Sequence, residues 1–349
     1  MSSLIRSGLH VRHFCNMLNQ NNKSSDSKYV RPVKGLRKLI TDYLTKFVGS
    51  YEDILSKRFP KAFKVYQVFT VGTRSLYTDI IEYLRISREL SYGRDVHSLS
   101  YQELIVYYQT PKDLLKVAPT LLVSAAPFAN YVVFPLALYF PKHLLSQQFW
   151  DNEIKFNYQL EKTTKRLKHN RPIFRQLQFK LNSIPKQLPD STDGLDLREQ
   201  CKLIFDKIGS GTHPTVEEIL NVAPVFNQEP YGLSHLPTIH LIHLCKMHGI
   251  ASYPRKIPRL VNYGRYIHEL DLAILRMGGP TQLPFHDLKH ASYMRGLNPF
   301  GCKPEELIGW LDKWLLISKT LNGTSLSLLL HCPIFLGYNQ PSNWKLIYK

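Results

Sequence analysis

The sequence predicts an all-α fold with a membrane anchor, and three observations support this prediction. Apolar side chains recur at steps of three, four and seven residues through most of the 349-residue chain, as in helices that bury one face. No segment alternates apolar and polar residues for long enough to indicate a strand. Residues 117–141 form a run of 25 without a charged side chain, although the formal net charge of the chain is +18. We therefore expect a basic, helical, membrane-anchored protein.

The N-terminus has the composition of a mitochondrial transit peptide. Its cations include Arg6, Arg12 and Lys23, it contains several serines, and no acidic residue precedes Asp26. Apolar residues at helical spacing give it the amphipathic face that such peptides have. We assign residues 1–28 to the transit peptide, and a loose terminus without a targeting role is the alternative.

Two helices are expected before the uncharged run. The apolar pattern of residues 54–84 predicts one amphipathic helix with a break near Gly72. A shorter helix follows at residues 98–115, and Ser100 with Glu103 three residues later is the sequence pattern of a capping box. This second helix leads directly into the uncharged run.

The uncharged run predicts a transmembrane segment at residues 114–141. At about 1.5 Å per residue its helix would be roughly 37 Å long, more than the hydrocarbon core of about 30 Å. Pro127 and Pro135 interrupt the helix and release carbonyl groups for which lipid offers no donor. We expect Ser124 and Asn130 to form a polar seam along the span, packed against a second copy or another subunit. A long buried hairpin of a soluble domain is the alternative.

The region beyond residue 142 is long enough to bury a core of its own. Apolar residues between 160 and 181 form one stripe of a long helix whose other faces are basic, with a kink or an end expected at Pro172. Further helices are predicted, several of them with Gly or Pro at their edges. Their ranges are 197–208, 214–226, 233–247, 258–277, 283–294, 304–320 and 325–336.

The charge is the strongest functional clue outside the predicted span. The chain has 45 Lys and Arg residues against 27 Asp and Glu residues, and the surplus extends well beyond the N-terminus. In the segment 253–266 cations alternate with tyrosines, a combination that can contact phosphates and stack on exposed bases. Anionic lipid headgroups as the ligand, or a face that is merely solvated, are the alternatives. The candidate binding residues are Arg255, Lys256, Arg259, Arg265, Arg295, Lys162, Lys165 and Arg166.

No enzymatic site is expected from the sequence. His286 and His290 are four residues apart, but Asp287 stands where a zinc protease needs the longer glutamate, and no third ligand lies near in the sequence. His240 and His243 are better explained as core or interface histidines. The five cysteines are scattered, and the sequence has no phosphate-loop, dinucleotide-binding, nucleophile-elbow or calcium-loop motif. We predict a non-enzymatic protein without a metal or cofactor.

Short motifs in a fixed order carry a family resemblance. They are Pro-Phe-Ala-Asn-Tyr at 127–131, Phe-Pro at 140–141, Gly-Thr-His-Pro at 211–214, Arg-Gly-Leu at 295–297, Glu-Glu-Leu at 305–307, Trp-Leu at 310–311 and 314–315, and a leucine run at 325–330. Each motif is weak alone, whereas their order and spacing are specific and extend over about two thirds of the chain. The chain resembles the LETM-domain family of mitochondrial inner-membrane proteins, whose name abbreviates leucine-zipper, EF-hand-containing transmembrane, and is most similar to the short branch of that family.

The resemblance implies an all-α domain of 14-3-3-like shape that faces the mitochondrial matrix and binds mitochondrial ribosomes. It also implies roles in respiratory-chain biogenesis, mitochondrial structure and ion balance. The charges on the two sides of the predicted span are balanced, so the matrix orientation rests on the resemblance alone. Longer family members are cation/proton exchangers with coiled coils and an EF-hand, and this sequence shows neither feature.

Two functional hypotheses follow. The first is a single-pass inner-membrane protein whose matrix domain binds the mitochondrial ribosome, through ribosomal RNA or a ribosomal protein, with a homo-oligomer through the span as an option. The second is an exchanger or regulator of K⁺ or Ca²⁺ against protons, which ranks lower because the span has no ionisable group to relay a proton. The expected organisation is a transit peptide at 1–28, an amphipathic helical region at 29–113, the span at 114–141, a LETM-type domain at 142–340 and a C-terminal tail at 341–349.

Overall fold

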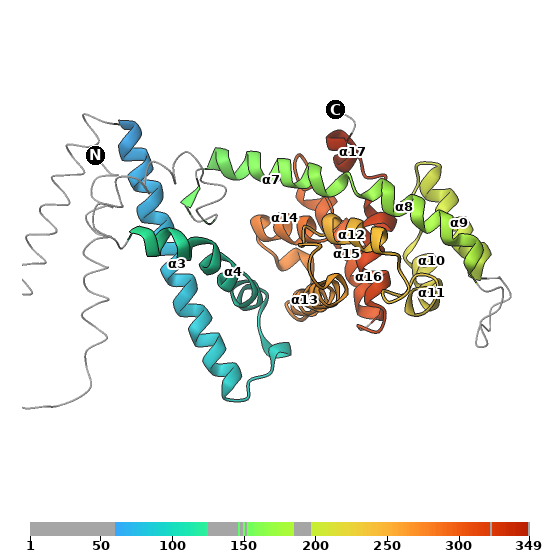
Figure 1. The fold of residues 1–349 in the computed structure, drawn as a ribbon, viewed down its shortest axis with the longest axis horizontal. Coiled ribbons are helices and arrows are strands. Elements are labelled where there is room, and N and C mark those ends of the chain that lie inside the picture. The colour runs from blue at the N-terminus through green and yellow to red at the C-terminus, as the bar shows by residue number, and fades with distance from the viewer. Residues whose placement is uncertain are drawn as a thin grey trace, which may run out of the picture. The chain divides into compact units, whose positions relative to one another are not determined.

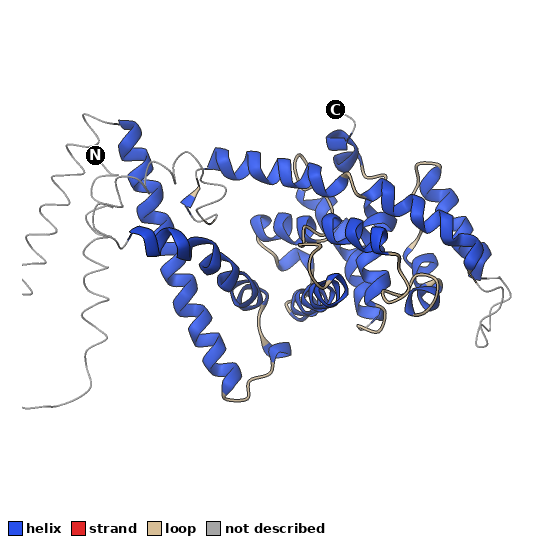
Figure 2. Ribbon diagram, in the orientation of Figure 1, coloured by secondary structure: helices blue, strands red, loops and turns tan. Residues whose placement is uncertain are grey.

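The structure is a computed structural model, and it describes residues 60–124, 146, 149–150, 152–184, 197–321 and 323–347. In these ranges the structure contains helices and no β-strand (Figures 1 and 2). The all-α prediction is thus confirmed for the described part of the chain. The expected transit peptide and Asn130 lie outside the described residues. Among the helices that are described, none is long and apolar enough to cross a membrane.

The helices have the following bounds in chain order. They are α3 (Pro60–Ser91), η1 (Val96–Ser98), α4 (Tyr101–Ser124), α7 (Asn152–Leu167), α8 (Asn170–Phe179), η3 (Lys180–Ser183), α9 (Leu197–Gly209), α10 (Val216–Asn221), α11 (Ala223–Asn227), α12 (Thr238–Met247), α13 (Lys256–Arg276), η4 (Pro280–Gln282), α14 (Phe285–Met294), α15 (Pro304–Leu321), α16 (Leu326–Gly337) and α17 (Pro341–Ile347).

The chain divides into two compact units. One comprises Met1–Leu76 with Gln147–Trp150, and the other comprises Tyr77–Ser146 with Asp151–Lys349. The core and the candidate site described below both lie in the second unit.

The predicted capping box of α4 is confirmed. The Glu103 amide donates to Ser100 Oγ at 3.3 Å, and the Ser100 amide donates to Glu103 Oε2 at 2.9 Å. Arg85 and Arg94 also bond the Glu103 carboxylate, at 2.8 and 2.9 Å. The break expected near Gly72 is absent, because α3 continues from Pro60 to Ser91 without interruption.

The core of this unit is built around α13, α15 and α16 (Figure 1). The segment Ser327–Gly337 of α16 is buried on all sides, as expected for a helix that is apolar around its whole circumference. Gly296, which follows α14, has a φ of +91°, and a Cβ atom there would lie 2.8 Å from Pro333 Cβ. The close approach of this turn to α16 therefore depends on a residue without a side chain.

A buried ion pair and a tryptophan join α13, α15 and the C-terminal end of α14. Arg295 and Asp271 have fully buried side chains, and Arg295 Nη2 lies 2.5 Å from Asp271 Oδ1. Arg295 Nε also donates to Asp271 Oδ1 at 2.8 Å, and Trp314 Nε1 donates to Asp271 Oδ2 at 3.0 Å. The carboxylate thus accepts bonds from both partners, which offsets the cost of burying its charge.

The ends of two predicted elements can be compared with the structure. The long helix expected around residues 160–181, with a kink or an end at Pro172, is divided into α7 and α8 just before this residue. Pro172 lies in the first turn of α8, where a helix does not use the missing N–H. Residues 341–347 of the expected C-terminal tail form α17. Asn343 fastens this helix, because its Oδ1 accepts from the Asn298 amide at 2.7 Å and its Nδ2 donates to the Gly337 carbonyl at 2.7 Å. A buried side-chain amide, which has no apolar periodicity, is the reason that the pattern did not reveal α17.

Candidate nucleic-acid interface

Two stretches without any acidic residue pack against each other in the structure. The segments 162–189 and 230–268 contain no Asp or Glu. The first includes the end of α7 and all of α8, and the second includes α12, which packs on both of these helices. Because the two stretches are far apart in sequence, only the fold joins them into one region of positive charge.

α8 and α12 are neighbours, and the contacts at their two ends show that they run antiparallel. At one end, His169 Nδ1 lies 2.9 Å from His243 Nδ1. At the other end, Lys180 Nζ donates to the His235 carbonyl at 2.9 Å and to the Pro230 carbonyl at 3.1 Å. These contacts fix the register of the two helices, so their exposed residues lie on adjacent helices.

The buried residues of α8 determine which of its residues are exposed to solvent. Ile173, Phe174 and Leu177 are buried in the core and determine the rotation of the helix. The residues on the opposite side therefore face solvent. We call the outward residues of the two helices the α8–α12 face: Lys168, Arg171, Arg175, Phe179, Ile239 and Lys246, all of them exposed.

The cations of the α8–α12 face are free to bind a ligand. In the part of the chain that the structure describes, no side chain forms a hydrogen bond or ion pair with any of its four Lys and Arg residues. Arg171, Arg175 and Phe179 follow one another at steps of four, roughly 6 Å apart along the helix. Phe179 is 86% exposed and Ile239 is 62% exposed, so the face also offers apolar contact.

The histidine pair between the two helices is neutral. Burial, followed by the neighbouring His243 and Lys246, lowers the pKa of His169 to about 4, and burial followed by Lys246 lowers the pKa of His243. The positive charge of the face at neutral pH is therefore carried by its Lys and Arg side chains.

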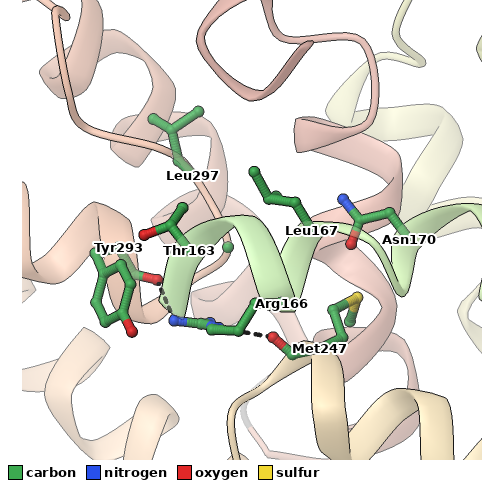
Figure 3. A pocket seen from close by; sticks show the side chains of 8 residues that line it. Thr163, Arg166, Leu167, Asn170, Met247, Tyr293 and Leu297 are labelled. Atoms are coloured by element: carbon green, nitrogen blue, oxygen red, sulfur yellow. Dashed lines mark hydrogen bonds between the residues drawn. The ribbon is translucent and has the colours of Figure 1, made fainter. Parts of the chain in front are cut away.

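Arg166, a predicted binding residue, has a structural role (Figure 3). Its side chain is buried, and its Nε and Nη1 atoms donate to the carbonyls of Met247 at 2.7 Å and Tyr293 at 3.0 Å. A small cavity beside it is lined by Asn170, whose buried side-chain amide has no hydrogen-bond partner in the described part of the chain. Arg166 joins α7 to the ends of α12 and α14, and we remove it from the candidate surface.

Arg295 was also predicted to bind and is likewise removed. Its side chain is 0% exposed and is bonded to Asp271, so it cannot reach a macromolecular partner. Lys165 is exposed but is paired with Glu161 at 2.7 Å, and Lys162 is half-buried. Neither lysine is part of the α8–α12 face, and the charge of Lys165 is already paired.

The segment 253–266 does not present alternating cations and rings. Tyr266 is buried and Tyr263 donates its hydroxyl to the Met294 carbonyl at 2.9 Å, so neither ring is available for stacking. Arg259 donates to the Ala251 carbonyl at 3.1 Å and so holds the loop before α13. Of the predicted residues here, Arg255 and Arg265 are exposed, while Lys256 is half-buried with its Nζ 4.3 Å from the centroid of the exposed Tyr253 ring.

The remaining histidines lie in the core or apart from one another. His240 Nε2 lies 2.8 Å from His331 Nε2, and His331 Nδ1 lies 2.7 Å from the Ser327 carbonyl, which fixes the tautomers of this buried pair. Within the described ranges, no three His, Cys, Asp or Glu side chains are grouped closely enough to hold a metal ion. Ser124 is the last residue of α4, and the rest of the predicted polar seam lies beyond the described residues.

Comparison with known proteins identifies the family. The family described as "LETM1-like, RBD" matches residues 99–335, more than half of the chain. The chain belongs to the LETM1-like family. A human protein named LETM1 domain-containing protein 1 is 30% identical over 322 residues, which cover 90% of this chain and 87% of the human protein.

Two further relatives agree with this assignment. The protein of the same name from Xenopus tropicalis is 32% identical over 293 residues, covering 83% of this chain and 81% of the frog protein. A Schizosaccharomyces pombe protein named LETM1 domain-containing protein mdm28, mitochondrial, is 25% identical over 280 residues, covering 78% of this chain and 56% of that protein. The predicted family is thus confirmed.

Within the LETM1-like domain, motif residues and surface residues have separate roles. Arg295, Trp310 and Trp314 of the family motifs are buried, and they hold α13 to α16 together. Lys168, Arg171 and Arg175 lie in the helix whose basic faces were noted in the sequence, but neither they nor Phe179 and Lys246 were among the predicted site residues. In the sequence, these residues are marked only by the absence of acidic residues over two long stretches. This absence indicates a joint surface only because α8 and α12 are neighbours in the fold.

Proposed function

We propose that this LETM1-like chain is a mitochondrial protein that binds the mitochondrial ribosome through its α8–α12 face. The proposal rests on one observation: the two stretches without acidic residues pack against each other through α8 and α12, and the exposed Lys and Arg side chains of these helices have no partner among the described residues. The family assignment and the word mitochondrial in the name of the S. pombe relative support the location. Ribosome binding at this face would support respiratory-chain biogenesis and, through it, mitochondrial structure.

The physical basis of the proposal is electrostatic. A ribosome presents a dense array of phosphate groups, and Lys and Arg side chains that replace its counterions gain affinity from their release. Unpaired cations contribute more to such binding than paired ones, since no internal ion pair must be broken. The four cations of the α8–α12 face meet this condition.

Membrane attachment is a second part of the proposal. We propose that the segment at residues 114–141, which contains the uncharged run 117–141, anchors the chain in the inner mitochondrial membrane, with the LETM1-like domain in the matrix. This arrangement would hold a bound ribosome near the site where membrane subunits are inserted. Extraction of mitochondrial membranes with alkaline carbonate tests the anchor, because a peripheral protein is released and an integral one is retained.

Ribosome co-sedimentation tests the role of the face. We expect the combined variant Arg171→Glu, Arg175→Glu and Lys246→Glu to weaken binding by roughly 100-fold at low salt, from about 1 kcal/mol for each reversed charge. The matched control reverses three exposed lysines elsewhere in the unit, Lys313, Lys319 and Lys345. Equal binding by both triple variants would contradict the proposal.

A further inference from the structure

One side chain of the α8–α12 face is not explained by phosphate binding. Phe179 ends α8 with 86% of its surface exposed, the largest exposure among the large apolar side chains of the described residues. In the described part of the chain no aromatic ring packs on it. Burying such a ring against the core would be favourable, so its exposure points to a partner that covers it.

The ring is placed in line with cations. Arg175 lies one helical turn before Phe179 and Arg171 lies one turn before Arg175, so that the three side chains form a row along α8. Lys180, next to Phe179, is bonded to the carbonyls of His235 and Pro230 and so fixes this end of α8. The row thus combines two free guanidinium groups with one free aromatic ring on a fixed helix.

We infer that this row binds an unpaired segment of RNA, with backbone phosphates on Arg171 and Arg175 and a base stacked on Phe179. The inference rests on the proposed ribosome binding and names the component that is bound. A base in a duplex is covered on both of its flat sides, whereas an unpaired base has a free π-face that can stack on an aromatic side chain. A purely electrostatic partner would need the arginines and would leave Phe179 exposed.

An acidic protein segment is the competing partner. The carboxylates of such a segment would form ion pairs with Arg171 and Arg175. The Phe179 ring would then contribute only apolar contact. The row favours RNA because both arginines are unpaired and the ring stands at the same spacing in the same line, so that a single flexible strand can engage all three. The protein partner is therefore one of the outcomes of the test.

The test measures binding of the purified full chain, in detergent, to a short fluorescein-labelled single-stranded RNA by fluorescence anisotropy. We expect Phe179→Ala to weaken this binding by roughly 5- to 100-fold, the effect of removing one base stack, and Phe179→Trp to preserve it. Leu203→Ala is the matched control, because Leu203 is a 56% exposed apolar residue on α9. Arg171→Gln with Arg175→Gln should lower the dependence of log affinity on log salt by about 1.4, or about 0.7 for each phosphate that is no longer neutralised.

A blunt-ended RNA duplex of the same length, in which every base is paired, supplies the second comparison. We expect it to bind more weakly than the single strand and to be insensitive to Phe179→Ala. Equal affinity for both RNAs with no effect of Phe179→Ala would overturn the inference and leave charge alone as the basis of binding. Ribosome co-sedimentation that depends on Arg171 and Arg175, without affinity for free RNA, would also overturn it in favour of a ribosomal protein, while the proposed function would stand. Absence of specific ribosome binding altogether would instead contradict the proposed function.

Discussion

Arg295 in the core and Arg171 on the α8–α12 face show how one residue type serves two purposes in this molecule. Arg295 is 0% exposed and forms an ion pair with Asp271. Arg171 is exposed and has no partner among the residues that the structure describes. The first side chain contributes to the stability of the domain, whereas the second is available for a ligand. The difference lies in the presence of a carboxylate within reach, which a count of positive charges does not reveal.

The largest expected effect of pH falls on the core. Burial lowers the pKa of His240 to about 2, with neighbouring His331 as the second cause, and that of His248 to about 3, with neighbouring Arg166 as the second cause. Burial also lowers the pKa of His331 to about 4. The folded state keeps these side chains neutral, while the unfolded chain binds protons near pH 6.5. Their contribution is therefore complete above pH 6.5 and is lost as the pH falls below it, by about 1.4 kcal/mol per histidine and pH unit.

Chemical denaturation between pH 7.5 and pH 5 measures this effect. We expect His240, His248 and His331 together to remove about 4 kcal/mol of stability per pH unit below 6.5, comparable over two units to the whole stability of a typical domain. Glu103 does not contribute in this range: burial raises its pKa, but bonds from Arg94, Ser100 and Arg85 outweigh burial and lower it to about 2. Its stabilisation is lost only below about pH 4.5. A flat stability profile from pH 7.5 to pH 5 would show that the histidines are protonated in the folded core.

A smaller loss is expected when the buried ion pair is broken. Asp271→Ala leaves the Arg295 guanidinium buried without its carboxylate and also removes the acceptor of Trp314 Nε1. We expect the free energy of unfolding to fall by about 3–5 kcal/mol. Asp312→Ala on the exposed side of α15 is the control and should change it by less than about 0.5 kcal/mol. Similar values for the two variants would mean that Asp271 does not hold the core.

The sequence predicts the helices of this domain better than it predicts the surface. Periodic apolar residues specify α9, α13, α15 and α16 because each of these helices buries a broad apolar side. α17 was missed because it is fastened by the amide of Asn343, and amide hydrogen bonds leave no periodic signal.

The binding site is a prediction from the charge of the sequence, and the structure shows which of its residues are exposed. The excess of cations indicates an anionic partner, but Arg166 and Arg295 donate to groups far away in the sequence, so that their burial depends on the tertiary fold. The free cations could be identified only after α8 and α12 were found to be neighbours, because each acid-free stretch alone also fits a solvated helix.

The smallest effect on stability is expected for substitutions on the α8–α12 face. Arg171→Ala with Arg175→Ala removes two exposed side chains that have no partner in the described residues, so the free energy of unfolding should change by less than about 0.5 kcal/mol for each substitution. The same double variant should nevertheless lose most of its binding to ribosomes at moderate salt, since both guanidinium groups belong to the proposed binding surface. Denaturation and co-sedimentation of one protein preparation measure the two quantities together. A large loss of stability would assign these arginines to the fold, as Arg295 is, and would remove the distinction between the two regions.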